Sequence, residues 1–322
     1  MLVNGKWTKD WQPVQKSDKE GRFIRQVSSF RNWITPDGRP GPTGNGGFKA
    51  EAGRYRLYVA LICPWASRTL IARKLKGLEE IIPVTVVNPV LSDEGWQFGG
   101  YPGVDEDPLF KATYLHEIYS RADTNFTGRA TVPFLWDIQQ NVMVNNESAD
   151  ILRMFDSAFD AIIPSDLRLY PEALGDEINR LNVEIYDKLN NGVYRAGFAS
   201  SQQSYDEAVS DVFGILDRLE SRLEGQDYLI GNQLTETDIR TFVTLIRFDA
   251  AYHGIFKTNR RQIKDYANLS AYMERILRLP GVIETVNMDH ITRGYYAIKA
   301  LNPLGIRPTG PAHIEALLAS VA

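Results

Sequence analysis

Residues 54–78 read RYRLYVALICPWASRTLIARKLKGL, where the pattern changes abruptly from the polar chain before it. Residues 54–61 are mostly aromatic and aliphatic, which is typical of a buried strand. From Pro64 to Leu78 the apolar residues recur at helical spacing and predict a helix. Cys63 stands at the junction, before a proline that is favoured at the first helical position because its missing N–H would be unpaired there anyway. The stretch therefore predicts a strand that passes into a helix at a cysteine.

The strands and helices predicted after this helix follow one another in the order of a known type of domain. A strand at Ile81–Val87 makes a strand–helix–strand unit, whose two strands we expect to be parallel with a right-handed crossover. A long polar, glycine-rich loop follows at residues 88–110. The pattern then predicts a short helix, two strands paired as a hairpin and a last helix, at Tyr114–Ser120, Thr131–Asp137, Asn141–Asn145 and from Glu147 onward. The order β, α, β, α, β, β, α is that of a thioredoxin-like domain, which we place at residues 51–158.

The chain on either side of this domain has a different character. Residues 1–50 are polar, and PDGRPGPTGNGG at 36–47 is too rich in proline and glycine for a helix or a paired strand, so we interpret them as an N-terminal arm. Past about Phe159 the strand signals fade and helical periodicity dominates. We expect residues 159–322 to form an all-helical domain with an irregular tail, GYYAIKALNPLGIRPTGP.

Two capping patterns support the helical assignment. Ser204 and Glu207 have the spacing of a capping box at the start of a helix that runs to Leu223. Thr235 and Asp238 repeat that spacing before the apolar run TFVTLIRF. The expected fold class is therefore an α/β thioredoxin-like N-terminal domain followed by an all-α helical bundle.

Composition limits the classes of function. The chain has 322 residues, 43% of them hydrophobic and 24% charged, which is typical of a globular protein long enough for two domains. Lys and Arg number 36 against 40 Asp and Glu, so no basic footprint for nucleic acid appears. No apolar run reaches the roughly 18 residues of a spanning helix, and the N-terminus lacks a leader-like apolar segment, so we expect neither membrane insertion nor secretion.

The single cysteine carries further expectations. Cys63 has no partner for an intramolecular disulfide, and a structural zinc cluster usually takes two or more cysteines, so we expect no metal. A reducing compartment follows, and we expect the protein to be cytoplasmic.

Cys63 has the position of a nucleophile. A helix N-terminus stabilises a thiolate, so we expect the pKa of this thiol to lie below the value of about 8.5 for an unperturbed cysteine. The alternative is a buried small hydrophobic residue, which describes many lone cysteines. Because the chain has no second cysteine, a mixed disulfide at Cys63 must be resolved by an external thiol.

Two further features of the sequence indicate a binding site for a peptide. A cis bond between Val132 and Pro133 would expose the Val132 N–H and C=O to an extended peptide, and the alternative is a trans proline at a strand start. Glu147 and Ser148 open a helix where backbone donors and a hydroxyl can bind a carboxylate, and the alternative is ordinary helix capping. Backbone pairing and carboxylate capture beside a reactive cysteine together describe a glutathione site.

The chain resembles the glutathione transferase superfamily, and specifically its Xi class, the glutathionyl-hydroquinone reductases. The similarity covers nearly the whole chain. Besides the cysteine segment it is carried by GRATVPFLWD, NNGVYRAGF, LTETDIRTFVTLIRFDAAYHGIFKTN and GYYAIKALNP. The omega class has a similar cysteine but lacks these later segments.

The resemblance implies a role for each candidate residue. It makes Cys63 the nucleophile and implies that Tyr194 donates a proton in the hydroquinone site. We expect Tyr194 to lie in a turn-rich, exposed segment, NNGVYRAGF, where its hydroxyl can reach a ligand. Tyr252 and one of the pair Tyr295-Tyr296, for which we prefer Tyr295, are implied to lie near the sulfur. The residues implied to bind glutathione are Trp96, Arg129, Val132, Glu147 and Ser148. From the residues alone, each tyrosine could equally be a core residue.

The resemblance also implies partners and a reaction. It implies glutathione as co-substrate, glutathionylated hydroquinones as substrates and a homodimer formed through the helical domains. Ser67 and the pair Ile298-Lys299 depart from the family pattern, and we expect Ser67 to change only the polarity of the helix surface. Two other functions stay open: an omega-like thioltransferase or dehydroascorbate reductase, and a glutathione-binding protein without enzymatic activity.

Overall fold

The computed structural model describes residues 1–8 and 17–321, and the chain divides into two compact units. As far as their residues are described, unit 1 consists of Met1–Gln12, Gln26–Leu167 and Thr285–Gly294, and unit 2 of Pro13–Arg25, Arg168–Glu284 and Tyr295–Ala322. These divisions differ from the domain boundaries expected from the sequence. The arm does not stand apart, because its backbone pairs with distant segments: Asn32 N–H donates to the carbonyl of Val144 at 3.0 Å.

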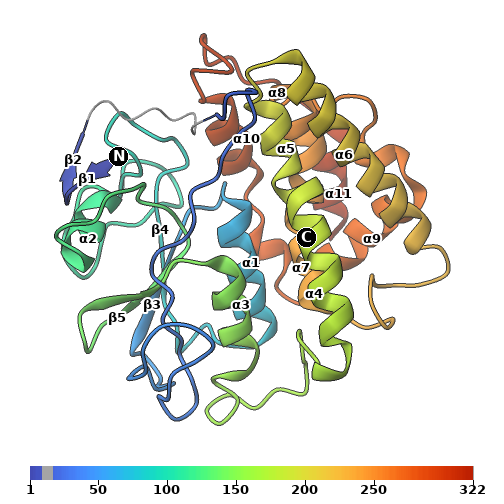
Figure 1. The fold of residues 1–322 in the computed structure, drawn as a ribbon. Coiled ribbons are helices and arrows are strands. Elements are labelled where there is room, and N and C mark those ends of the chain that lie inside the picture. The colour runs from blue at the N-terminus through green and yellow to red at the C-terminus, as the bar shows by residue number, and fades with distance from the viewer. Residues whose placement is uncertain (9–16, 322) are drawn as a thin grey trace. The chain divides into compact units, whose positions relative to one another are not determined.

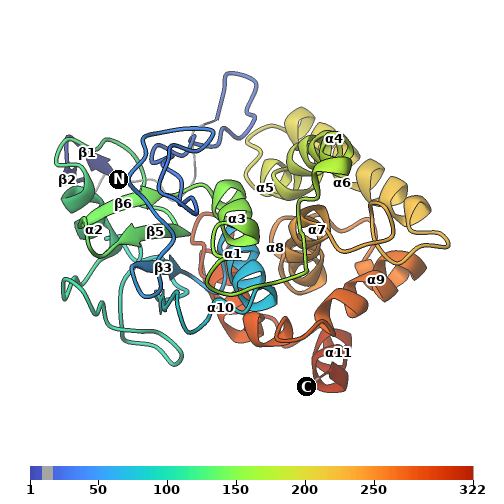
Figure 2. The same ribbon diagram turned by 90° about the horizontal axis from the view of Figure 1, so that it is seen from below.

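Unit 1 is built on a four-stranded sheet in the order β4-β3-β5-β6 (Figures 1 and 2). Its strands are β3 (Tyr55–Val59), β4 (Val84–Val86), β5 (Phe134–Asp137) and β6 (Val142–Asn145). The first pair, β3 and β4, is parallel, and the pairs β3–β5 and β5–β6 are antiparallel. This topology confirms the predicted parallel crossover and hairpin.

Three helices accompany this sheet, namely α1 (Pro64–Leu75), α2 (Leu115–Ala122) and α3 (Ser148–Ser157). Helices α1 and α3 pack against each other, and Figure 2 shows them together, with α2 beyond the opposite side of the strands. Between sheet and helices lies a core of large buried side chains, among them Trp136, Tyr58, Phe134 and Phe155. The element order predicted for the thioredoxin-like domain is thus confirmed.

Prolines shorten two of the predicted strands. The predicted strand Ile81–Val87 pairs only from Val84, after Pro83, and the predicted strand Thr131–Asp137 begins only after Pro133. Proline has no N–H to donate to a ladder, so pairing starts beyond it. The arm adds one small hairpin that the sequence did not reveal, β1 (Leu2–Val3) with β2 (Lys6–Trp7).

Unit 2 is helical, and among its described residues strand pairing is limited to isolated bridges. Its helices are α4 (Gly175–Ile185), α5 (Gly192–Gly197), α6 (Gln202–Arg222), α7 (Glu236–Arg247), α8 (His253–Ile255), α9 (Ala267–Leu277) and α11 (Ala312–Val321). Helix α10 (Met288–Tyr296) begins in unit 1 and ends in unit 2. The expected irregular tail follows α10, and α11 then ends the described chain.

One of the two predicted capping boxes is present. At α7, the Thr235 N–H and hydroxyl both donate to the Asp238 carboxylate, at 2.7 and 3.0 Å. At α6 the prediction is wrong, because the helix begins one turn earlier and Ser201 is its N-cap, accepting from the N–H of Ser204 at 3.2 Å. The side chains of Ser204 and Glu207 instead bind the arm.

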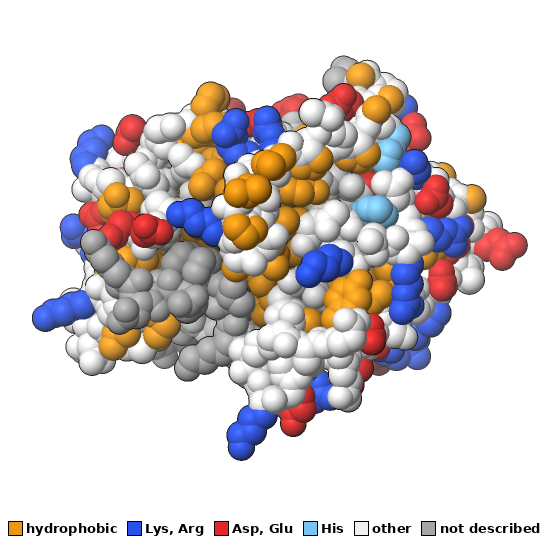
Figure 3. Space-filling model, turned by 90° about the horizontal axis from the view of Figure 1, so that it is seen from above, with side chains coloured by type: hydrophobic (Ala, Val, Ile, Leu, Met, Phe, Trp, Pro, Cys, Tyr) orange, Lys and Arg blue, Asp and Glu red, His pale blue; other side chains and the backbone are white. Residues whose placement is uncertain are grey.

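Charged side chains of both signs lie on the surface. On the face drawn in Figure 3, Lys and Arg side chains are interspersed with Asp and Glu side chains. Among the described residues no helix is long and apolar enough to cross a membrane.

Candidate active site

Cys63 is the N-cap of α1. Its backbone is extended, with φ −74° and ψ 118°, and Pro64 follows within the first helical turn, as predicted. Its sulfur lies 3.5 Å from the carbonyl oxygen of Val132, to which the thiol donates. This hydrogen bond favours the protonated thiol, whereas the partial positive charge on the N–H groups of the helix N-terminus favours the thiolate.

Ser67 lies one turn further along α1. It is only 3% exposed, and its hydroxyl donates to the carbonyl oxygen of Cys63 at 3.2 Å. The expectation that Ser67 affects only the polarity of the helix surface is therefore wrong, since its side chain is buried and bonded to the backbone of the cysteine.

The bond between Val132 and Pro133 is cis, as predicted, and not the alternative trans form. Val132 is 6% exposed, and its carbonyl group is the one that faces the sulfur of Cys63. Two segments that are 69 residues apart in the chain thus meet at one point of unit 1.

Glu147 is the N-cap of α3 and accepts from the N–H of Ala149 at 3.1 Å. Its second carboxylate oxygen accepts from the hydroxyl of Ser28 at 2.9 Å. The alternative from the sequence, ordinary capping, thus describes these contacts of Glu147. They fix its carboxylate at the start of the helix.

Ser148 follows in the first turn of α3 and is 3% exposed. Its hydroxyl oxygen lies 3.5 Å from a guanidinium nitrogen of Arg68, a residue of α1 that is 1% exposed and lies over the ring of Trp65. The buried guanidinium of Arg68 therefore lies beside the Ser148 hydroxyl. A positive charge there adds to the preference of a helix start for an anion.

The other two predicted glutathione residues lie on loops of unit 1. Trp96 is half-buried, and its carbonyl oxygen accepts from the N–H of Leu115 at 2.9 Å. Arg129 is also half-buried, and its N–H donates to the side chain of Gln26 in the arm at 3.0 Å.

Hydrogen bonds link the hydroxyl groups of three tyrosines in unit 2. The hydroxyl oxygen of Tyr295 lies 2.6 Å from that of Tyr194 and 2.8 Å from that of Tyr252. Tyr252 and Tyr295 are buried, at 0% and 3% exposure. We call these three residues the tyrosine cluster. The cluster includes Tyr295 and not Tyr296. That Tyr252 and Tyr295 lie near the sulfur of Cys63 stays a prediction.

The surroundings of Tyr194 differ from the expectation. We expected an exposed, turn-rich segment, but Tyr194 lies in the short helix α5 and is half-buried. Aromatic rings surround it, with the centroid of Phe256 at 5.2 Å and those of Phe23 and Phe198 at 6.3 Å. The glycines of NNGVYRAGF permit close helix packing here: a Cβ on Gly197 would lie 2.3 Å from the ring of Phe256.

Burial fixes the protonation state of the inner tyrosines. It raises the pKa of Tyr252 and of Tyr295 well above the ordinary value of 10.0, and the nearby Tyr194 adds to the shift. Both are therefore neutral hydroxyl groups over the whole neutral range, able to donate hydrogen bonds within the cluster.

These shifts predict how stability depends on pH. Above about pH 10 the unfolded chain loses tyrosine protons that the folded chain keeps, so the free energy of unfolding falls as pH rises. The slope that each such tyrosine contributes rises through this range toward about 1.4 kcal/mol per pH unit, as the unfolded tyrosine becomes fully ionised. Denaturant unfolding between pH 9 and 11 should show the fall, and Tyr295→Phe should remove one such contribution. An unchanged slope in that variant would mean that Tyr295 ionises in the folded protein.

Several residues at these sites were missed by the sequence reasoning. Arg68 and Ser28 contact Ser148 and Glu147, and Arg25 lies over the ring of Tyr194. Only Arg68 had a local signal, as a charged residue on the helix that starts at Cys63. Among the described residues no group of three or more His, Cys, Asp and Glu side chains could hold a metal ion.

Comparison with known proteins finds similar sequences along the chain. Family models described as the N-terminal and C-terminal domains of glutathione S-transferase match residues 62–158 and 202–275. The chain is 51% identical over 312 residues to the glutathionyl-hydroquinone reductase YqjG of Escherichia coli (strain K12), covering 96% of this chain and 94% of that protein.

Solved structures give the same result. The glutathione-bound structure of YqjG matches with a TM-score of 0.89 and 49% identity, covering 97% of this chain and 95% of that one. The Xi glutathione S-transferase from Phanerochaete chrysosporium matches with a TM-score of 0.89 and 46% identity, covering 94% and 98%.

The thioredoxin-like sheet, the cysteine at a helix start and the helical second unit define a glutathione transferase. Within that superfamily the chain belongs to the Xi class, the family of the glutathionyl-hydroquinone reductases.

Proposed function

We propose that this protein reduces S-glutathionyl hydroquinones to hydroquinones, with glutathione as co-substrate and Cys63 as nucleophile. The observation that carries the proposal is the position of Cys63 as N-cap of α1, with its sulfur beside the Val132 carbonyl, in a chain similar along its length to a named glutathionyl-hydroquinone reductase. The glutathione in the YqjG structure supports the choice of co-substrate.

The proposed reaction has two steps. The Cys63 thiolate attacks the glutathione sulfur; a sulfur–sulfur bond forms, the bond from that sulfur to the aromatic carbon breaks, and the electron pair passes to the carbon. A tyrosine hydroxyl protonates this carbon. The thiolate of a second glutathione then attacks the mixed disulfide, which releases oxidised glutathione and restores the Cys63 thiolate. The proton lost by the second glutathione returns to the tyrosinate.

The glutathione moiety is held, in this proposal, by groups of unit 1. The backbone of Val132 pairs with the peptide of glutathione, and the helix start at Glu147 and Ser148 binds its γ-glutamyl end. The buried charge of Arg68 behind the Ser148 hydroxyl supports binding of a carboxylate there. Trp96 and Arg129 complete the set on the ground of the family resemblance.

The tyrosine cluster supplies the proton. Aromatic carbon is a poor leaving group, so protonation in the transition state contributes about 10² to 10⁴-fold to the rate. Tyr252 and Tyr295 are buried, whereas Tyr194 is half-buried, so we assign the donor role to Tyr194. Tyr295 can then donate to the oxygen of Tyr194 and stabilise it after proton loss.

One set of assays tests the proposed function. A purified sample is assayed with a glutathionyl hydroquinone, a glutathione mixed disulfide and dehydroascorbate, each with glutathione. We expect turnover of the hydroquinone. Activity with only the last two substrates would favour the omega-like alternative, and glutathione binding without any turnover would favour a binding protein.

We also propose that the protein is a homodimer formed through its helical unit, in a cytoplasmic compartment. The family resemblance motivates the dimer, and the single cysteine motivates the compartment. Light scattering at micromolar concentration should give twice the mass of the 36.4 kDa chain. A monomer under these conditions would rule the dimer out.

A further inference from the structure

Residues 17–25 of the arm, which we call the clasp, form a closed turn within unit 2. The N–H of Asp18 donates to the carbonyl of Arg22 at 2.9 Å, and the Asp18 carboxylate accepts from the N–H groups of Glu20 and Arg22 at 3.0 and 2.8 Å. Gly21 has a φ of +85°, and a Cβ there would lie 2.8 Å from the hydroxyl of Ser200. Hydrogen bonds within the clasp itself therefore define the turn, apart from the contacts that its side chains make with distant residues.

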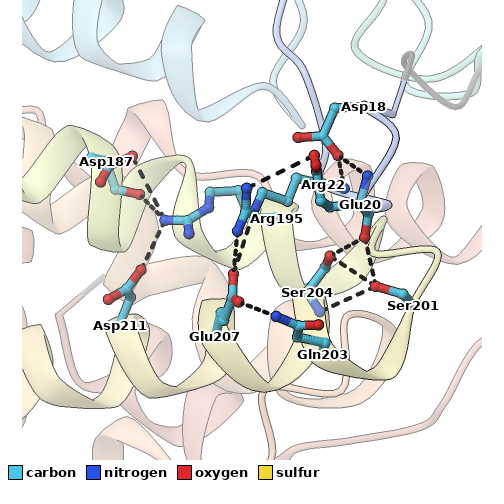
Figure 4. Close-up of polar contacts among 10 residues, drawn as sticks. All are labelled: Asp18, Glu20, Arg22, Asp187, Arg195, Ser201, Gln203, Ser204, Glu207 and Asp211. Atoms are coloured by element: carbon cyan, nitrogen blue, oxygen red, sulfur yellow. Dashed lines mark hydrogen bonds and ion pairs between the residues drawn. The ribbon is translucent and has the colours of Figure 1, made fainter.

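The first turns of α6 hold the clasp (Figure 4). The carbonyl oxygen of Glu20 accepts from the hydroxyl groups of Ser201 and Ser204, at 2.8 and 2.7 Å. The Arg22 guanidinium donates twice to the carboxylate of Glu207, each time at 3.2 Å. Ser204 and Glu207 thus bind the clasp and do not form the predicted capping box.

Beyond these anchors the clasp brings Phe23 and Arg25 onto Tyr194. Phe23 stacks on the Tyr194 ring, and the guanidinium carbon of Arg25 lies 4.8 Å from the centroid of that ring. The Nε of Arg25 donates to the side-chain oxygen of Asn191 at 2.8 Å, which fixes the guanidinium plane. Arg25 precedes Tyr194 by 169 residues in the sequence. A distant segment thus places a positive charge beside the proposed proton donor.

We propose that Arg25 is a positioning residue that stabilises the negative charge developing on Tyr194 when its hydroxyl gives up a proton. This inference rests on the proposed function, in which Tyr194 protonates the aromatic carbon. The attraction between a guanidinium and a neutral ring is weak, but it becomes an attraction between opposite charges as the phenolate forms. The contact is thus stronger in the transition state than in the ground state, which is the condition for a rate effect.

Three variants test the inference, with kcat and KM measured for a glutathionyl hydroquinone and for a glutathione mixed disulfide. Arg25→Met should lower kcat for the hydroquinone about tenfold, with KM within about twofold and an increased solvent deuterium isotope effect. Reduction of the mixed disulfide, whose leaving thiolate needs no carbon protonation, should be unchanged. Arg25→Lys keeps the charge and should recover part of the loss.

Arg261→Met is the matched control, because the guanidinium carbon of Arg261 lies 3.8 Å from the ring centroid of Tyr266, outside the tyrosine cluster. It should leave both reactions unchanged. Equal losses of both reactions in Arg25→Met, or identical rates for the Met and Lys variants, would overturn the inference and leave Arg25 with a packing role. If the wild-type protein reduces the hydroquinone and Arg25→Met is equally active, the inference alone fails; if the wild type is inactive, the proposed function fails and the inference with it.

Discussion

Cys63→Ser should reduce turnover of glutathionyl hydroquinones by about 10⁴-fold or more, to background. The mechanism depends on attack by a thiolate on sulfur, and a serine hydroxyl stays protonated and unreactive under the same conditions. No second cysteine is present to replace it. The measurement is steady-state reduction of a glutathionyl hydroquinone by the variant and the wild type at equal concentration.

The same variant should still bind glutathione, because the groups proposed to hold it are Val132, Glu147 and Ser148. Calorimetric titration of Cys63→Ser with glutathione checks this, and its melting temperature serves as the control for folding. Loss of binding in a folded variant would show that the glutathione site is misplaced. Turnover near the wild-type rate would show that another group is the nucleophile.

Tyr194→Phe should slow reduction of glutathionyl hydroquinones by about 10² or more and leave simple disulfide exchange nearly unchanged. The substitution removes the proton that the leaving carbon needs but keeps the ring that packs against Phe256 and Phe198. Tyr296→Phe is the control, since Tyr296 follows Tyr295 directly but lies outside the tyrosine cluster.

The contrast between substrates decides the role of Tyr194. Equal losses with both substrates would mean that Tyr194 supports the site in general, and the acid would then be sought at Tyr252 or Tyr295. Unchanged rates with both substrates would leave Tyr194 as a packing residue.

Local patterns predicted the fold well where the local interaction is the one that the folded chain uses. The strand and helix around Cys63 follow from residues 54–78, and Thr235 with Asp238 forms the capping box that its spacing predicts. The same spacing failed at Ser204 and Glu207, because these side chains contact Glu20 and Arg22. The contacting residues are more than 180 positions apart, so a four-residue sequence pattern such as the capping box contains no information about them.

The candidate site shows the same limit. The position of Cys63 at a helix start and the cis bond before Pro133 could be inferred from neighbouring residues. The meeting of three tyrosine hydroxyl groups depends on how α5, the π-helical turn Phe248–Tyr252 after α7 and the end of α10 pack. The positions of Ser28 and Arg25 depend on the path of the arm. The hydrophobic pattern of each segment carries no information about these pairings.

In the proposed reaction, Cys63 removes the glutathionyl group from the hydroquinone as a mixed disulfide. Intact-protein mass spectrometry after a single addition of a glutathionyl hydroquinone, with no glutathione present, detects this mixed disulfide itself. We expect a mass increase of one glutathionyl group, located on the peptide that contains Cys63, absent from Cys63→Ser and reversed by added glutathione. Release of hydroquinone with Cys63 unmodified throughout, or a mass increase equal to the whole substrate, would contradict it.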